Sequence, residues 1–227
     1  MLEDMAFLSL FLEWTIGHLH LIQLTWESSS YAMPLGSLYF VFAWNIFKTV
    51  YSHSPLSFVF GAIWTCCDLV IIYLTIRNLR RPDNPDFLTS PSFKQHLIPI
   101  LAMIFLFWVT SILIAISQFG EVSLYWAGVF LSFFMSVSFI LMGLSRRSSR
   151  QQHEHIILSK VAVSALLVWY SAMRFDNLYM ALNIFYLSIP LDVVYLVVLE
   201  WFKEPRFKEV LSAPASPVET KEQASSA

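Results

Sequence analysis

The chain has 227 residues, of which 57% are hydrophobic and 13% are charged, and its mean hydropathy is +0.61. A soluble domain has about 45–50% apolar and about 25% charged residues, so this composition indicates an integral membrane protein. The net charge of −2 and the short loop clusters of lysine and arginine argue against a nucleic-acid-binding protein. Cys66 and Cys67 are adjacent in an apolar run, where they build neither a disulfide framework nor a zinc site.

Apolar stretches predict an all-α protein with seven membrane-spanning helices, because about 20 residues at about 1.5 Å each cross the roughly 30 Å hydrocarbon core. The acidic start without a small-residue cleavage site predicts a retained first helix rather than a signal peptide. The run His53-Ser54-Pro55 should separate spans two and three, and Pro190 should kink or loosen the last span. The expected spans are residues 5–24, 31–51, 56–76, 96–117, 122–144, 156–173 and 178–201.

Basic residues predict the orientation of the bundle. They cluster between spans three and four, between spans five and six, and after span seven. With seven spans these clusters share one side of the membrane, which the positive-inside rule makes cytosolic. We therefore expect a multi-pass protein of the endoplasmic reticulum with a lumenal N-terminus and a seven-helix domain at residues 1–202. Residues 203–227, rich in Ser, Ala, Pro and Glu, should form a disordered cytosolic tail.

Four polar side chains in the predicted spans are candidate catalytic residues: Glu13, Asn45, Asp68 and Asp192. Counted from the lumenal helix ends, Glu13 and Asn45 lie about 10 Å deep and the two aspartates about 20 Å deep. A polar group without a partner is expensive in hydrocarbon, so these side chains should face protein, water or substrate. Desolvation disfavours a charged carboxylate, so a buried carboxyl can keep a proton for general acid catalysis.

Aromatic residues at mid-span depth form a second candidate feature. The faces of tryptophan and tyrosine stabilise cations, and more strongly where water is absent. A dry aromatic chamber beside a carboxylic acid suits a carbocation cyclisation that begins with protonation. Packing or lipid contact is the commoner role of an aromatic side chain in a membrane helix, so that alternative stays open at each position. The candidate substrate-binding residues of this type are Trp44, Trp64, Trp126 and Tyr195.

Several short runs resemble a known family. They are YAMPL at residues 31–35, FAWNI at 42–46, DLVIIY at 68–73, YWAGVF at 125–130, Arg174 after span six, and LDVVY at 191–195. In order and spacing they resemble the small integral-membrane terpene cyclases of fungal meroterpenoid and indole-diterpene biosynthesis, of the paxilline and pyripyropene types. The resemblance implies a seven-helix enzyme that cyclises a linear isoprenoid epoxide on an aromatic or polyketide-derived head, without a metal or other cofactor. It also implies a membrane lipid environment, with an epoxidase and a prenyltransferase as pathway partners.

One position departs from that family. Its pattern in the second span is Ala-Trp-Glu, and the resemblance assigns epoxide protonation to this Glu and to an Asp in the last span. Asp192 matches the Asp, but Asn45 stands in place of the Glu. An amide donates no carboxyl proton, although it can donate an orienting hydrogen bond. We favour Asp192 as the acid, alone or with Asp68, oriented by Asn45; alternatively Glu13 takes over, or the reaction is altered or lost.

Other polar residues have weaker functional readings. His18 and His20 are two positions apart, so they face different sides of a helix and do not predict a metal site. Lys48, Lys160 and Arg174 are expected to extend toward the membrane interface, although the resemblance adds Arg174 to the substrate-binding candidates.

The aspartates also have readings other than catalysis. Asp68 fits a structural hydrogen bond between helices as well as it fits catalysis. Asp83 and Asp86 lie in a proline-containing loop, which argues against a magnesium-diphosphate site.

A different class of protein also fits these features. The competing hypothesis is a seven-helix transporter or receptor-like protein, in which the buried polar layers line a ligand or proton path.

Overall fold

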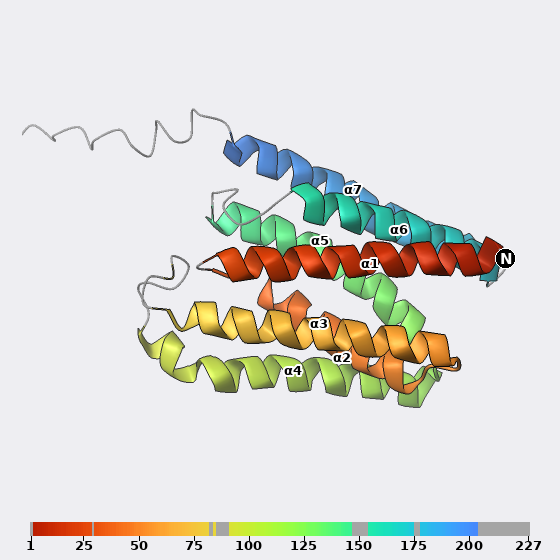
Figure 1. Ribbon diagram of the computed structural model, residues 1–227, viewed down its shortest axis with the longest axis horizontal. Coiled ribbons are helices and arrows are strands. Elements are labelled where there is room, and N and C mark those ends of the chain that lie inside the picture. The colour runs from red at the N-terminus through yellow and green to blue at the C-terminus, as the bar shows by residue number, and fades with distance from the viewer. Residues whose placement is uncertain are drawn as a thin grey trace, which may run out of the picture.

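The computed structural model is a bundle of α-helices that run in alternating directions along its long axis (Figure 1). It describes residues 2–28, 30–81, 84, 91–146, 154–174 and 178–203. The expected tail beyond residue 203, together with Asp83 and Asp86, lies outside these ranges. The described helices are α1 Leu2–Glu27, α2 Leu35–Val50, α3 Pro55–Leu79, α4 Pro91–Phe119, α5 Val122–Arg146, α6 Glu154–Arg174 and α7 Leu178–Lys203.

Within the described ranges, three segments are long and apolar enough to cross a bilayer: Pro55–Leu79, Gln95–Phe119 and Val122–Arg146. The multi-pass membrane class predicted from composition is therefore confirmed, while the full set of seven crossings stays a prediction. Helix α2 is apolar but has only 16 residues, which is about 24 Å. It is shorter than the expected span at residues 31–51 because the chain before it is non-helical up to Pro34.

The boundary between α2 and α3 lies at the predicted break. The Ser54 side chain accepts a hydrogen bond of 3.1 Å from the Ser57 backbone N–H, and Pro55 begins the helix, where a missing N–H is tolerated. Several residues later, Gly61 packs so closely on Thr49 that a Cβ atom at position 61 would collide with it. Thr49 lies in the last turn of α2, whereas Gly61 lies well inside α3. Helix α3 therefore extends beyond α2 at the end of the bundle where the two helices are joined.

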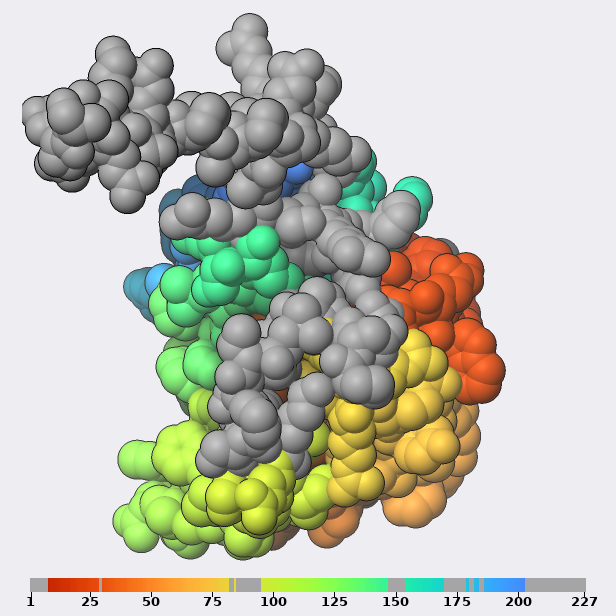
Figure 2. Space-filling model, turned by 90° about the vertical axis from the view of Figure 1, so that its left-hand side faces the viewer, coloured from red at the N-terminus to blue at the C-terminus, as the bar shows by residue number. Residues whose placement is uncertain are grey.

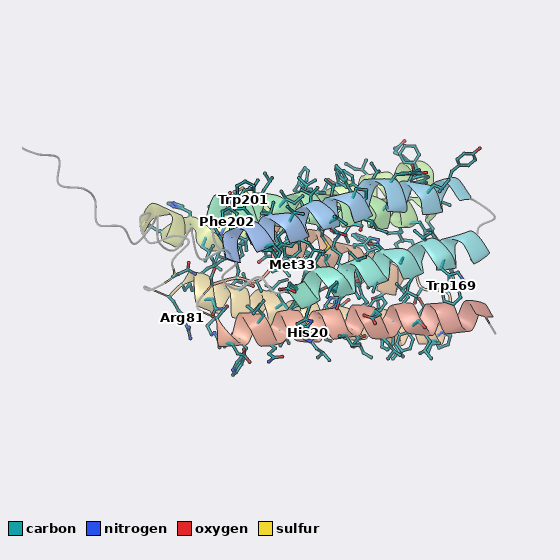
Figure 3. All side chains as sticks on the ribbon, turned by 90° about the horizontal axis from the view of Figure 1, so that it is seen from above. His20, Met33, Arg81, Trp169, Trp201 and Phe202 are labelled. Atoms are coloured by element: carbon teal, nitrogen blue, oxygen red, sulfur yellow. The ribbon has the colours of Figure 1, made fainter. Side chains whose placement is uncertain are left out.

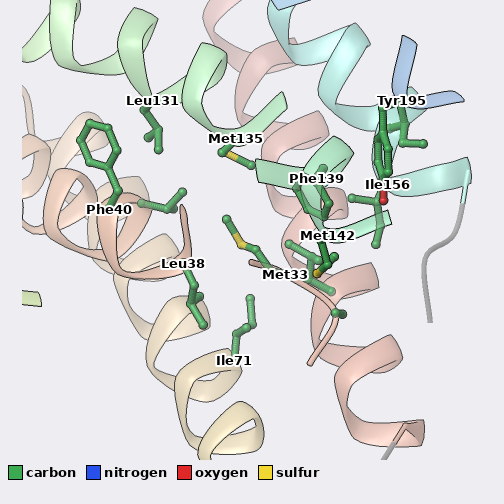
Figure 4. Packing of buried hydrophobic residues seen from close by; sticks show 14 of the residues in the cluster. Met33, Leu38, Phe40, Ile71, Leu131, Met135, Phe139, Met142, Ile156 and Tyr195 are labelled. Atoms are coloured by element: carbon green, nitrogen blue, oxygen red, sulfur yellow. The ribbon is translucent and has the colours of Figure 1, made fainter. Parts of the chain in front are cut away.

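The helices form a closed ring in the order α1, α3, α2, α4, α5, α7 and α6, with α6 packed against α1. Helix α2 also packs on α5 across the ring, so α2 and α5 each pack against three other helices. Buried apolar side chains fill the space between the helices (Figure 4), among them Leu38, Phe40, Ile71, Met135 and Phe139. Many large apolar side chains also lie on the outer surface, as a lipid-facing bundle requires.

Helices α1, α3, α5 and α7 all end on the same side of the bundle, at the left of Figure 1 and facing the viewer in Figure 2. Arg77 and Arg146 occupy the last turns of α3 and α5. Figure 3 places Arg81 near this end and Trp169 near the opposite one. The basic residues at these helix ends are therefore gathered on one side, as the sequence predicted for a membrane protein of fixed orientation.

Candidate active site

A pocket lies inside the bundle between α1, α2, α3, α5 and α6. Most of its wall is apolar and includes Met33 and Met135, which Figure 4 shows among the buried side chains. Its volume is about 50 Å³, and a water molecule needs about 10–15 Å³ on the same scale, so a few waters fit. An isoprenoid chain would require side chains or helices to move apart. The polar residues of the wall are Glu13, His18, Asp68, Ser159 and Lys160.

The first polar group beside the pocket is the Asp68 cluster, which consists of His18 of α1, Asn45 of α2 and Asp68 of α3; His18 and Asp68 form part of the wall. All three side chains are buried. Asn45 Nδ2 donates a hydrogen bond of 2.7 Å to Asp68 Oδ2, and His18 Nε2 lies 3.1 Å from Asp68 Oδ1. Asp68 therefore joins three helices, and both of its carboxyl oxygens are engaged.

Local helix geometry fixes the histidine of this cluster. His18 Nδ1 lies 2.8 Å from the carbonyl oxygen of Trp14, one turn earlier in α1. That contact turns Nε2 toward Asp68. Because α3 extends beyond α2, Asn45 and Asp68 meet at the same depth. The estimate that placed them about 10 Å apart in depth was wrong, since it assumed helix ends level with one another.

The second polar group is the Lys160 cluster, which consists of Ser136 of α5, Lys160 of α6 and Asp192 of α7. Lys160 Nζ donates to both oxygens of Asp192, at 2.7 and 2.8 Å, and to Ser136 Oγ at 2.6 Å. The Lys160 residue is only 8% exposed, so the expectation that it extends to the interface was wrong. The hydrogen bond expected from Asn45 to Asp192 was also wrong, because Asn45 binds Asp68 and Asp192 binds Lys160.

Three tryptophan rings lie next to the Asp68 cluster, and Trp14 is central. Its ring centroid is 6.5 Å from that of Trp44 and 6.2 Å from that of Trp64, both edge to face. Trp14 contributes to the pocket wall, whereas Trp44 and Trp64 lie behind it. Trp44 Nε1 donates to the Leu124 carbonyl at 2.8 Å, and Trp64 Nε1 donates to Thr15 Oγ1 at 3.1 Å.

The Trp14 indole differs from its two neighbours in its hydrogen bonding. Its Nε1 atom is buried and has no partner within the part of the chain that the structure describes. The Trp44 ring, by contrast, also packs closely on Gly128 of α5, where a Cβ atom would come within 3.1 Å of the ring and would require it to shift. Trp14 is thus the aromatic residue with a donor available beside the pocket.

The remaining predicted site residues lie in different surroundings. Glu13 is part of the pocket wall. Trp126 is 45% exposed and Tyr195 packs in the core against Phe139, and neither forms part of the pocket wall. The side chain of Arg174 lies outside the described residues. The catalytic and substrate-binding roles assigned from the sequence stay predictions.

Comparison with protein-family models matches residues 1–204 to the Pyr4-like transmembrane terpene cyclases. The chain belongs to this family. The family predicted from short sequence runs is therefore confirmed, and the protein is classed with membrane terpene cyclases. Comparison with curated proteins and with solved structures found no significant match.

In this Pyr4-like cyclase, sequence reasoning overlooked His18, Lys160 and Trp14 as parts of the site. A signal for the first two was available. A charged or ionisable side chain at mid-membrane depth needs a partner of opposite charge. The third helix carries a buried aspartate that could pair with His18, and the last helix carries one that could pair with Lys160. Trp14 offered no signal of its own, because only the arrangement of the helices distinguishes it from the other tryptophans.

Proposed function

We propose that this member of the Pyr4-like family converts a linear isoprenoid epoxide, joined to an aromatic or polyketide-derived head, into fused rings by proton-initiated carbocation cyclisation. The observation that carries the proposal is the wall of the internal pocket, where a buried carboxyl–imidazole pair lies beside the Trp14 ring in a largely apolar lining. A proton donor and a water-poor surface that tolerates positive charge are the two requirements of such a reaction.

The pocket has features that favour a moving carbocation. Tryptophan rings stabilise cations, and Trp14 on the wall is backed by Trp44 and Trp64. The ammonium of Lys160 would repel a cation, but Asp192 binds it through both carboxyl oxygens. In this proposal Asp192 supports catalysis by neutralising Lys160. The substrate enters by separating apolar side chains such as Met33 and Met135, and methionine adapts readily to new shapes.

The reaction is tested by expressing the chain in yeast microsomes with epoxidised farnesyl and geranylgeranyl aromatic substrates. We expect a product of unchanged mass with new rings and a new hydroxyl group. The same substrates without the epoxide should stay linear, because an alkene is much harder to protonate. Conversion of neither epoxide would contradict the proposal. Transport of the substrate across the membrane without a change in its connectivity would also support the transporter hypothesis.

We also propose that all seven helices cross the membrane of the endoplasmic reticulum, with a lumenal N-terminus and the basic helix ends in the cytosol. The gathering of Arg77 and Arg146 at one end of the bundle supports this orientation. Glycosylation acceptor sites added at the N-terminus and at the C-terminus test it. Only the N-terminal site should be glycosylated, and modification of the C-terminal site would reverse the assignment.

A further inference from the structure

The hydrogen bonds around His18 determine where a proton must be. The Trp14 carbonyl oxygen can only accept a hydrogen bond, so His18 Nδ1, 2.8 Å away, carries the donated proton. A neutral imidazole with a proton on Nδ1 has a bare acceptor at Nε2. The 3.1 Å contact between Nε2 and Asp68 Oδ1 therefore needs a second proton, because two acceptors would repel each other.

That second proton is either on Asp68, as a carboxylic acid, or on His18, as an imidazolium. In both cases one transferable proton is shared between Nε2 and Oδ1, and both residues belong to the pocket wall. Both side chains are almost fully buried, so few water molecules compete for this proton. The pair therefore has the composition and position of a general acid.

The Lys160 cluster lacks this property. An ammonium group has three donors, and Lys160 Nζ has three acceptor atoms within 2.8 Å: Ser136 Oγ and the two oxygens of Asp192. Each donor is therefore already used. Asp192 itself does not contribute to the pocket wall, since Lys160 occupies that position. Of the two clusters, only the Asp68 cluster presents a shared proton to the pocket.

We propose that the His18–Asp68 pair donates the proton that opens the epoxide, and that Asn45 is a positioning residue for Asp68. This inference rests on the proposed cyclase function. The proton passes from the pair to the epoxide oxygen as the carbon–oxygen bond breaks, which yields a hydroxyl group and a carbocation. Alkene electron pairs then form the ring bonds. The last cation loses a proton, which restores the pair, so the reaction is a net isomerisation.

The role of Asn45 follows from its single hydrogen bond to the pair. Its Nδ2 group donates to Asp68 Oδ2 at 2.7 Å, which fixes the carboxyl plane and leaves Oδ1 facing His18. Asn45 is buried and does not form part of the pocket wall. A proton donor is therefore not required at position 45, because the carboxyl of the adjacent helix reaches the pocket.

The first test is Asp68→Asn, which keeps the size of the side chain and removes the acid. We expect kcat for epoxide cyclisation to fall by about 10²–10⁴-fold, the usual contribution of a general acid. The exposed carboxyl Glu121, which pairs with His53 at the opposite end of the bundle from Arg77, provides the matched control. Glu121→Gln makes the same chemical change there and should leave kcat unaltered. Wild-type turnover in Asp68→Asn would overturn the proposal.

The second test separates loss of the acid from loss of the fold. The double variant Asn45→Asp/Asp68→Asn exchanges the two side chains, so the buried pair still consists of one amide and one carboxyl. We expect this variant to accumulate in microsomes like the wild type but to cyclise at least about 10²-fold more slowly, because its carboxyl no longer contacts His18. An exchanged variant with full turnover would overturn the proposal.

Two further arms complete the test. Asn45→Ser keeps a hydrogen-bond donor, and we expect it to retain more kcat than Asn45→Ala with little change in KM for either, as a positioning role requires.

A dead Glu13→Gln enzyme combined with an active Asp68→Asn enzyme would assign the acid to Glu13 and overturn the proposal. If wild-type microsomes form no cyclic product, the proposed function fails; if they do and Asp68→Asn equals them, only this inference fails.

Discussion

The Asp68 and Lys160 clusters each place a buried aspartate beside a nitrogen base, yet they differ in which partner reaches the pocket. In the Asp68 cluster the carboxyl and the imidazole both belong to the pocket wall. In the Lys160 cluster the ammonium belongs to the wall and the carboxyl of Asp192 is behind it. The same residue type can therefore serve chemistry in one place and charge neutralisation in the other, and the position relative to the cavity decides which.

The two clusters also differ in what their loss should do to the fold. Lys160 and Asp192 make a bidentate ion pair, and removing one member of such a pair leaves an unbalanced buried charge. The Asp68 cluster can exist in a neutral form, with a carboxylic acid beside an imidazole, so its net charge is not fixed by the geometry. We therefore expect single substitutions to be most damaging to stability in the Lys160 cluster.

The largest expected effect on stability is that of Lys160→Met. It removes the partner of Asp192 and should lower the free energy of unfolding by about 3–5 kcal/mol, the usual penalty for breaking a buried pair. Thermal unfolding of the detergent-solubilised protein measures the change. The double variant Lys160→Met/Asp192→Leu removes both charges and should recover most of the lost stability. If the single and double variants unfold alike, the ion pair does not stabilise the bundle in the way the geometry indicates.

A smaller effect is expected from Asn45→Ala. The substitution removes the donor to Asp68 Oδ2 and should lower the free energy of unfolding by about 1–3 kcal/mol, because a buried acceptor loses its partner. Ser136→Ala is the matched change in the other cluster. There Lys160 keeps both oxygens of Asp192, so the loss should be smaller. A larger loss for Ser136→Ala would reverse this comparison of the two clusters.

Trp14→Phe should have a still smaller effect on stability. The buried indole N–H has no partner among the residues described here, so removing it is favourable, while the smaller ring leaves a cavity; because the two terms oppose each other, the free energy of unfolding should change by no more than about 1 kcal/mol. Phenylalanine stabilises cations less well, and a difference of about 0.5–1 kcal/mol predicts cyclisation slower by about two- to fivefold. Steady-state kinetics in microsomes measure this. A large rise in KM instead would indicate that the N–H binds the substrate.

The smallest effect is expected from Trp126→Ala. This side chain is 45% exposed and does not form part of the pocket wall. The free energy of unfolding should change by no more than about 0.5 kcal/mol, and the rate of cyclisation should stay at the wild-type value. The variant therefore also serves as a reference for the three changes above. A clear loss of turnover would restore the substrate-binding role that the sequence predicted for Trp126.

Part of the fold and part of the site were predictable from local sequence. The Ser54-Pro55 helix start follows from short-range hydrogen bonding and the proline ring. The two histidines diverge as helical spacing requires: His18 contacts Asp68, while the His20 ring stacks near His155. The burial of Asn45 follows from the high energy of an amide in lipid.

The pairings between helices were not predictable in the same way. Asn45 was expected beside Asp192 and Lys160 was expected at the interface, but the structure joins Asn45 to Asp68 and Lys160 to Asp192. The first expectation followed the family pattern, and the second followed the usual extension of a lysine side chain to the interface, so neither took account of which helices pack side by side. The offset between α2 and α3, set where Gly61 packs on Thr49, decides which polar groups share a depth.

The sequence by itself determined the membrane class, the helix boundaries near Ser54 and the set of polar side chains that must avoid lipid. These properties depend on the solvation of each segment and on contacts within one or two helical turns. Only the tertiary structure decided that Asp68 faces the pocket while Lys160 stands between the pocket and Asp192. Which carboxyl reaches the cavity depends on how far neighbouring helices slide and turn against one another, and that is fixed by packing across the ring.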